Sequence, residues 1–230
     1  MTVYFRPALF KFLTELEANN DREWFKDNRD RYLADVQEPA LAFITDFGPR
    51  LARISSHFLA DPRASGGSLF RIHRDTRFGP DKTPYKTNTG VHFRHERSRD
   101  VHAPGYYLHL EPSACFAGVG MWHPEPAVAN SIRRSIHDDP GAWKKAAKSK
   151  RFADVWSTQP DDDEMLKRVP RDLDPTHPYA DDLRMKSFIA GRSLTQREVT
   201  GPSFIDEFEA RCRAASPYMS FLCDAVGVEF

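Results

Sequence analysis

The hydrophobic pattern of this sequence changes its period once, near residue 65, and this change is the strongest constraint on the fold. Upstream, apolar residues recur at helical spacing, as Leu9, Leu13 and Leu16 do. After the turn-forming run 64–67, apolar and polar residues alternate. A period of about 3.6 residues indicates an amphipathic helix, and strict alternation indicates a strand with one buried face. The chain is therefore predicted to form helices first and a sheet afterwards.

The alternating region predicts four strands in close succession. Loops and a turn at 111–113 connect them, and this order favours an antiparallel meander. A fifth strand is predicted much later in the chain. The expected strands are 68–73, 89–95, 106–111, 115–121 and 186–194.

The remaining segments predict helices on both sides of the sheet region. Helices are expected at about 125–137, 139–148 and 202–214, with a short terminal helix from Ser216. Neither a repeat nor a low-complexity linker divides the chain. We predict a single α+β domain over 1–230, with a helical part at 1–60, the sheet at 66–122 and a mixed helical part at 123–230.

The charge of the chain is balanced overall but not locally. Lys and Arg together number 33, as do Asp and Glu, so the formal net charge is zero. The segment 71–99 nevertheless holds eight basic and three acidic residues, which leaves the remainder acidic. A local positive site on an otherwise acidic protein favours a compact anionic ligand over a long polyanion.

Alternation along the strands sorts their side chains into two faces. Val91, Phe93, Leu108 and Leu110 fall on one face and are predicted to pack on the helices. Phe70 and Ile72 are assigned to the same face. The other face is polar, which is either the ordinary solvated side of an antiparallel sheet or the floor of a cleft. Its predicted members are Arg71, His73, His92, Arg94, Tyr107, His109 and Glu111.

The loop between the first two strands, at 75–87, is long and rich in charge. Gly79, Pro80 and Pro84 stiffen it. Arg74 is expected to pair with Asp75 or Asp81, because a cation facing the core needs a carboxylate.

Four further cations in and beside this loop exceed the available acids. They are Arg71, Arg77, Lys82 and Lys86. Such a surplus suits the recognition of phosphate or carboxylate groups. Tyr85 either orients a ligand or belongs to the core.

The expectations about cofactor, compartment and partners rest mainly on sequence motifs that the chain lacks. Cys115, Cys212 and Cys223 lack metal or redox spacing, so we expect buried thiols in a reducing cytoplasm. His109 and Glu111, with His92 or His73, make a metal site conceivable but without a sequence signature. We therefore expect no cofactor or metal, no membrane partner, and a monomer or small homo-oligomer.

The run RIHRDTRFGPDKTPYK at 71–86 resembles the signature of a bacterial family called domain of unknown function 2461. Further blocks are similar: NNDREWF at 19–25, GYYLHLEP at 105–112, GVGMWHPE at 118–125 and LKRVPR at 166–171. At His73 the sequence departs from the tyrosine usual in the family. The resemblance covers nearly the whole chain and implies a shared single-domain fold, but it implies no activity.

The leading hypothesis is a site for a small anionic, phosphorylated ligand between the charged loop and the polar sheet face. His109 and Glu111 are the candidates for moving a proton. One alternative is a non-enzymatic interaction module with a structural Arg/Asp network. A weaker one is a nucleic-acid processing factor that uses Arg94, Arg97 and Arg99. The candidate ligand-binding residues are Arg71, Arg74, Asp75, Arg77, Asp81, Lys82, Tyr85, Lys86 and His92.

Overall fold

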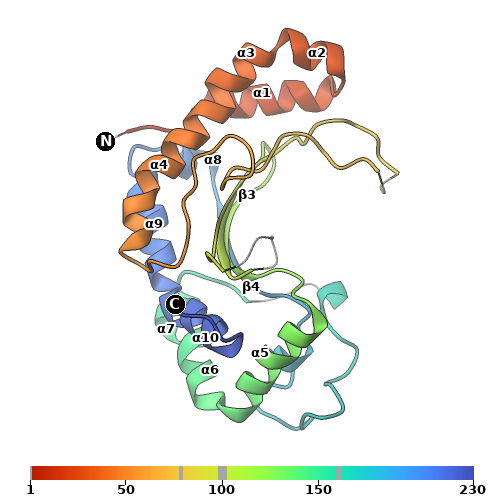
Figure 1. Ribbon diagram of the computed structural model, residues 1–230, viewed down its shortest axis with the longest axis vertical. Coiled ribbons are helices and arrows are strands. Elements are labelled where there is room, and N and C mark those ends of the chain that lie inside the picture. Colours follow the sequence, from red (N-terminus) through yellow and green to blue (C-terminus); the bar gives the residue numbers. More distant parts are fainter. Residues whose placement is uncertain (1, 78–79, 98–102, 159–161) are drawn as a thin grey trace.

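The computed structural model describes residues 2–77, 80–97, 103–158 and 162–230. It is a mixed α/β structure built on a four-stranded antiparallel sheet in the order β1-β2-β3-β4 (Figure 1). The meander of the first three strands and the added strand from the carboxyl-terminal half are therefore confirmed. The strands are β1 Thr89–Arg94, β2 Gly105–Leu110, β3 Cys115–Met121 and β4 Phe188–Leu194.

Helices precede and follow the sheet, as the change of period predicts. Asp21 caps α2 with its carboxylate, which accepts from the backbone N–H groups of Glu23 and Trp24 at 2.9 Å each. The α-helices are α1 Pro7–Ala18, α2 Arg22–Asp27, α3 Arg29–Tyr32, α4 Glu38–Ala52, α5 Pro126–Asp138, α6 Pro140–Ala147, α7 Lys150–Ala153, α8 Gln196–Val199, α9 Phe204–Ala214 and α10 Ser216–Ala225.

One face of the sheet packs on α4, α9 and α10 (Figure 1). Phe93 on β1 is fully buried there, and its ring centroid lies 4.9 Å from that of Phe47 on α4. Phe208 of α9 completes the cluster at 5.0 Å from Phe47. Burying one such side chain stabilises the fold by about 1.5–3 kcal/mol. The apolar sheet face predicted from alternation is thus the core.

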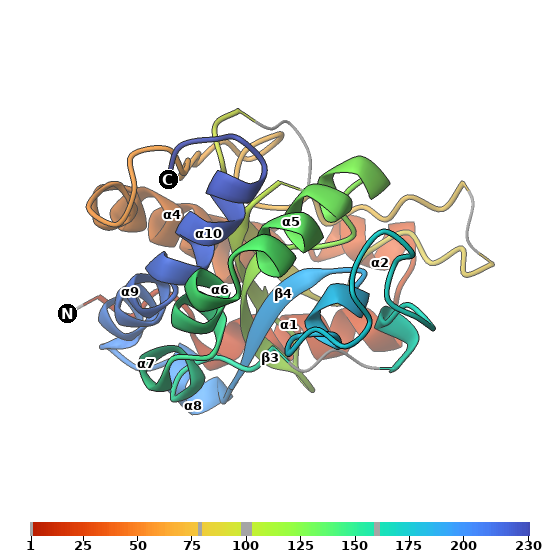
Figure 2. The ribbon, with the colours of Figure 1, turned by 90° about the horizontal axis from the view of Figure 1, so that it is seen from below.

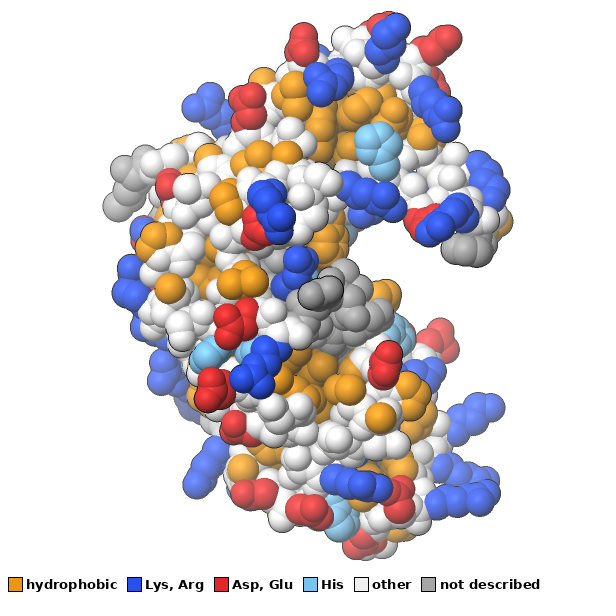
Figure 3. Space-filling view, viewed as in Figure 1, with side chains coloured by type: hydrophobic (Ala, Val, Ile, Leu, Met, Phe, Trp, Pro, Cys, Tyr) orange, Lys and Arg blue, Asp and Glu red, His pale blue; other side chains and the backbone are white. Residues whose placement is uncertain are grey.

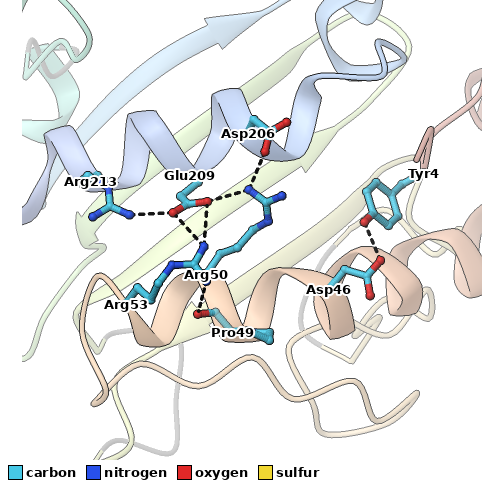
Figure 4. A network of polar contacts seen from close by, with 8 residues as sticks. All are labelled: Tyr4, Asp46, Pro49, Arg50, Arg53, Asp206, Glu209 and Arg213. Atoms are coloured by element: carbon cyan, nitrogen blue, oxygen red, sulfur yellow. Dashed lines mark hydrogen bonds and ion pairs between the residues drawn. The ribbon is translucent and has the colours of Figure 1, made fainter. Parts of the chain in front are cut away.

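A group of five charged residues, which we call the clasp, joins α4 to α9 on this side of the sheet (Figure 4). Glu209 accepts from Arg50 and Arg213 at 2.7 Å each and from Arg53 at 3.3 Å. Arg50 also donates to Asp206 at 2.6 Å. The Glu209 side chain is only 13% exposed. Each arginine of the clasp therefore has a carboxylate partner.

The opposite, concave face of the sheet fronts an open hollow between two ends of the molecule (Figure 3). Helices α1 to α3 lie at one end, and α5 and α6 lie at the other (Figure 1). The segments 71–77 and 80–87, which we call the arm, project from the body beside this hollow (Figures 1 and 2). The concave face is therefore a recess of the molecule and not a flat surface.

The predicted strand 68–73 is wrong as a continuous strand. Leu69 bridges to Val91 of β1, but four residues later His73 bridges to Tyr85, so the segment changes partner within its length. This change breaks the alternation: Leu69 and Ile72 are buried, whereas Phe70 is only half-buried and turns to the concave face. The prediction that Phe70 shares the core face with Ile72 is therefore also wrong.

The cysteines and the lengths of the helices can be compared with the predictions from the sequence. Cys115, Cys212 and Cys223 are free and buried, as expected. Within the described part of the chain, every helix is too short or too polar to cross a bilayer.

Candidate functional site

The concave face of the sheet is an ordered array of small and aromatic residues. Cross-strand pairing places Tyr107 between His92 and Gly118, and pairs Gly118 with Gly191. Paired residues share a face, so this row crosses all four strands. A parallel row lies on each side of it. One consists of Arg94, Gly105, Gly120 and Ile189, and the other consists of Gly90, His109, Phe116 and Ser193.

A pocket of about 400 Å³ lies on this array. Its size falls in the range of small-molecule sites. Phe116, Trp122 and Ile189 line it and are 36%, 50% and 41% exposed, which is unusual for large apolar side chains. Phe70 and Tyr107 line it as well, with ring centroids 5.8 Å apart. The pocket therefore offers apolar, largely aromatic walls.

The arm begins at the edge of this pocket and is held together by its own charges. Arg74 donates to Asp81 and, at 2.6 Å, to Thr83 Oγ1. Arg77 pairs with Asp75 at 2.7 Å. Hydrogen bonds from Arg77 hold the pKa of Asp75 well below its usual range, and bonds from Thr83, then from Arg74, lower the pKa of Asp81 to about 2. The expected Arg74–Asp81 pair is present, and Arg77 is not a surplus cation.

Arg71, Lys82 and Lys86 have no ion pair with any Asp or Glu that the structure describes. Lys82 is exposed and donates to the Thr76 carbonyl at 2.8 Å. Lys86 is half-buried instead, and its Nζ lies 5.3 Å from the ring centroid of Phe70, a pocket residue. Burial, and after it the charge of Arg71, lowers the pKa of Lys86. Lys86 is thus a partly desolvated cation at the border of the pocket, and none of the described carboxylates pairs with it.

Tyr107 and His109 of β2 form a hydrogen-bonded relay with Glu111, the residue that follows the strand. Burial, with the charge of Glu111 next, raises the pKa of Tyr107 to about 12, so its phenol keeps the proton at neutral pH. The Tyr107 hydroxyl lies 3.0 Å from His109 Nδ1, and His109 Nε2 lies 3.2 Å from Glu111. The phenol can therefore donate to Nδ1 while Nε2–H donates to the carboxylate. Of the three, only Tyr107 is among the described residues that line the pocket.

The side chain of His92 lies at the pocket, whereas that of Tyr85 packs against α2. His92 lines the pocket and is only 6% exposed, with its ring centroid 6.1 Å from that of Phe70. Tyr85 is 6% exposed, and its ring stacks on Phe25 at 4.0 Å on the side of α2. Of the two alternatives for Tyr85, the structure favours the core.

Of the residues of the nucleic-acid alternative, Arg94 and Arg97 lie in the described part of the chain. Arg94 donates to the Gly66 carbonyl at 3.3 Å, and Arg97 is exposed. Arg99, like Gly79 of the predicted turn, lies outside the described residues.

Sequence reasoning missed a second acid–base pair at the far end of the concave face. His123 directly follows Trp122, and its Nε2 lies 3.3 Å from Glu164, which also accepts from Ser187 at 3.1 Å. His123 has a φ of 42°, the left-handed region that non-glycine residues seldom adopt. Its position in the block 118–125 was the available signal, but Glu164 lies 41 positions further along the chain. Their proximity depends on the fold.

A larger hollow of about 1040 Å³ adjoins the pocket along β4 and shares Phe116, Ile189 and Gly191 with it. None of the site residues predicted from sequence is among the described residues that line it. The smaller pocket is therefore the better candidate site, although the other hollow is larger. Among the described residues, no group of three or more His, Cys, Asp or Glu side chains is arranged to hold a metal ion.

The family model described as "Conserved hypothetical protein (DUF2461)" matches residues 8–221. The chain belongs to this family. The match to DUF2461 includes the arm, all four strands and the pocket residues. Searches of the curated proteins and of the solved structures found no match.

Proposed function

We propose that this DUF2461 protein binds a small anionic ligand in the pocket on the concave face. The anionic group, a phosphate or carboxylate, contacts Lys86 and Arg71 at the border that the arm forms. The rest of the ligand lies in the pocket between Phe70, Tyr107 and Phe116. This proposal narrows the anion-binding set expected from sequence to two of its four surplus cations.

The observation that carries the proposal is the state of Lys86. Its ammonium group is half-buried and pairs with no carboxylate in the described part of the chain, which is unfavourable for folding because burial removes its hydration. A bound anion would compensate this cost, and Arg71 would add a planar guanidinium to the same anion. Lys and Arg side chains lie along the rim of the hollow in Figure 3, while hydrophobic side chains lie at its back.

The relay supports a second, chemical step at the same site. A proton taken from the ligand by the Tyr107 oxygen can be balanced by transfer of the phenolic proton to His109 Nδ1. Glu111 would stabilise the resulting imidazolium ion. We propose that Tyr107 is the group that meets the ligand, while His109 and Glu111 position it and take up the charge. In Tyr107→Phe, ¹⁵N NMR should show a His109 Nδ1 that has lost its hydrogen bond.

Titration with inorganic phosphate, followed through the backbone amide signals of 70–72 and 86, tests the binding proposal. We expect saturable shifts in the wild-type protein and an affinity about tenfold lower in Lys86→Met, the effect of losing one charge-assisted hydrogen bond. Lys82→Met removes the same charge from the exposed part of the arm and is the matched control. It should change the affinity less than about twofold, since exposed charges are screened.

Two outcomes would contradict the proposal. Equal losses in Lys86→Met and Lys82→Met would mean that the arm attracts anions only through its overall charge. An unchanged affinity in Lys86→Met would mean that Lys86 takes no part.

A further inference from the structure

We infer that the ligand carries a flat, unsaturated ring, which lies on Gly118 and Gly191 between the aromatic walls of the pocket. This inference rests on the proposed function and names the class of ligand within it. Two features of the pocket support it: the room above these two glycines, and the exposed aromatic side chains around them.

Five glycines occupy the concave face, and packing within the protein accounts for three of them. A Cβ atom at Gly90 would lie 2.7 Å from the Tyr107 hydroxyl. At Gly105 it would clash with the His92 imidazole. At Gly120, where φ is 119°, it would clash with the carbonyl oxygen of Phe188. Contacts within the protein therefore account for glycine at these three positions.

Gly118 and Gly191 have no such explanation. A Cβ atom at Gly118 would lie 3.8 Å from its nearest neighbour, the Cβ of Tyr107, and one at Gly191 would lie 4.0 Å from the Ala117 carbonyl oxygen. Both distances are ordinary van der Waals contacts. Glycine in a strand interior weakens the strand, so two paired glycines with room for side chains indicate that something approaches the backbone closely.

The walls of the pocket are largely aromatic. Tyr107 is the cross-strand neighbour of Gly118, and Phe116 and Trp122 lie along the same strand and its end. Phe116 and Trp122 are unusually exposed for aromatic side chains, and their rings line the pocket. A flat ring can lie on the backbone at 118 and 191 while its edges or faces meet these rings, an arrangement that aromatic pairs favour. A puckered ring of the same size is thicker and loses these contacts.

Phenyl phosphate and cyclohexyl phosphate are the probes that separate flatness from size and charge. Trp122 lines the pocket, so its indole N–H signal in a ¹⁵N spectrum is the reporter, assigned with Trp122→Phe. We expect the wild-type protein to bind phenyl phosphate about tenfold more tightly than cyclohexyl phosphate, a ratio typical of lost aromatic contacts. Inorganic phosphate, measured on the same samples at 70–72 and 86, reports the anion subsite alone.

Gly118→Val fills the space above the strand with a residue that strands accept well. We expect it to lower the affinity for phenyl phosphate by about tenfold or more and to leave that for inorganic phosphate within about twofold, because only the ring is displaced. Ser193→Val is the matched control: Ser193 is exposed on the same face of β4, two residues beyond Gly191, and it does not line the pocket. It should leave both affinities unchanged.

The outcomes separate this inference from the proposed function. Equal affinities for phenyl and cyclohexyl phosphate, or an unchanged affinity for phenyl phosphate in Gly118→Val, would overturn the flat ring and leave the anion subsite standing. Absence of any shift at Trp122 with phenyl phosphate would overturn it as well. If the affinity for inorganic phosphate is the same in Lys86→Met as in the wild-type protein, the proposed function is contradicted, whichever ring is preferred.

Discussion

The clasp and the border of the pocket are two charged regions on opposite sides of the same sheet. In the clasp, Glu209 accepts from three arginines, and Arg50 bonds to Asp206 as well. At the pocket, Lys86 is half-buried and no described carboxylate pairs with it. Charges that serve the fold are matched within the fold. A cation that is buried but unmatched is what a site for an external anion needs.

The largest effect should come from removing the carboxylate of the clasp. In Glu209→Ala, three arginines lose their shared partner at a position where Glu209 is only 13% exposed. We expect the free energy of unfolding to fall by about 2–3 kcal/mol, less than for a fully buried pair because the arginines are partly solvated. Urea denaturation measures this free energy.

Lys86→Met should change the free energy of unfolding by less than about 0.5 kcal/mol. The substitution loses the contact of the ammonium group with Phe70, but it also removes the cost of burying that charge. A loss in Lys86→Met as large as in Glu209→Ala would remove the contrast.

Two alanine substitutions on the concave face distinguish a glycine that the fold needs from one that the site needs. Gly105→Ala should lower the free energy of unfolding by about 1–3 kcal/mol, because the new Cβ atom meets the His92 ring. Gly118→Ala should raise it by about 0.5–1 kcal/mol, because alanine restricts the unfolded chain and meets no obstacle. Thermal and urea unfolding of both variants provide the check. A destabilised Gly118→Ala would mean that Gly118 serves the fold.

The two regions should also respond to pH in opposite ranges. Burial alone would raise the pKa of Glu209, but hydrogen bonds from Arg50, Arg213 and Arg53 outweigh it, so the pKa is lowered. The stabilisation by Glu209 is therefore complete above the ordinary glutamate value of 4.5 and is lost as the pH falls through the lower folded value. The difference in urea midpoint between wild type and Glu209→Gln should shrink on acidification. A constant difference would contradict the pairing.

For Lys86 the pH range is alkaline, because its pKa is lowered from a much higher ordinary value, and its charged form is the one that binds the anion. Between the lowered folded value and the ordinary 10.5, the unfolded chain holds the proton and the folded chain does not, so stability rises with pH. Affinity for inorganic phosphate should fall in the same range. Lys86→Arg should keep its affinity there, because arginine remains charged. A parallel fall in Lys86→Arg would assign the pH dependence to another group.

The smallest effect is expected on the outer part of the arm. Asp75→Asn breaks the pair with Arg77, but both side chains are exposed, at 41% and 73%. Exposed ion pairs contribute little, so the urea midpoint should not change measurably. Asp81→Asn, which loosens Arg74 and Thr83, is the comparison within the arm. A clear loss of stability in Asp75→Asn would show that the arm is part of the cooperative fold.

Local patterns were enough to predict most of the fold. The alternation of Tyr106, Leu108 and Leu110 places β2 correctly, and the helical spacing at either side of the sheet is confirmed. The failure at 68–73 has a physical cause, because the segment exchanges β1 for the return of the arm between Leu69 and His73. Alternation within one segment carries no information about such a change of partner.

The site was less predictable, because it depends on contacts between distant segments. Lys82 and Lys86 lie four positions apart in one loop, and nothing in the sequence indicates that one donates to a carbonyl while the other lies over Phe70. Gly118 and Gly191 become a pair only through the register of β3 and β4. The spacing of His109 and Glu111 identified them as candidates for moving a proton. Tyr107 was predicted only to share their face of the sheet, but it is the member of the relay that lines the pocket.

Whether Lys86 is held for an anion can be decided by urea denaturation of the wild-type protein and of Lys86→Met, each with and without a saturating concentration of phenyl phosphate. We expect nearly equal stability of the two proteins without ligand. With ligand, the wild-type protein should be clearly stabilised and Lys86→Met much less, because only binding to the folded state adds stability. A Lys86→Met protein that is strongly destabilised without ligand, or stabilised by the ligand as much as wild type, would show that Lys86 is not held for an anion.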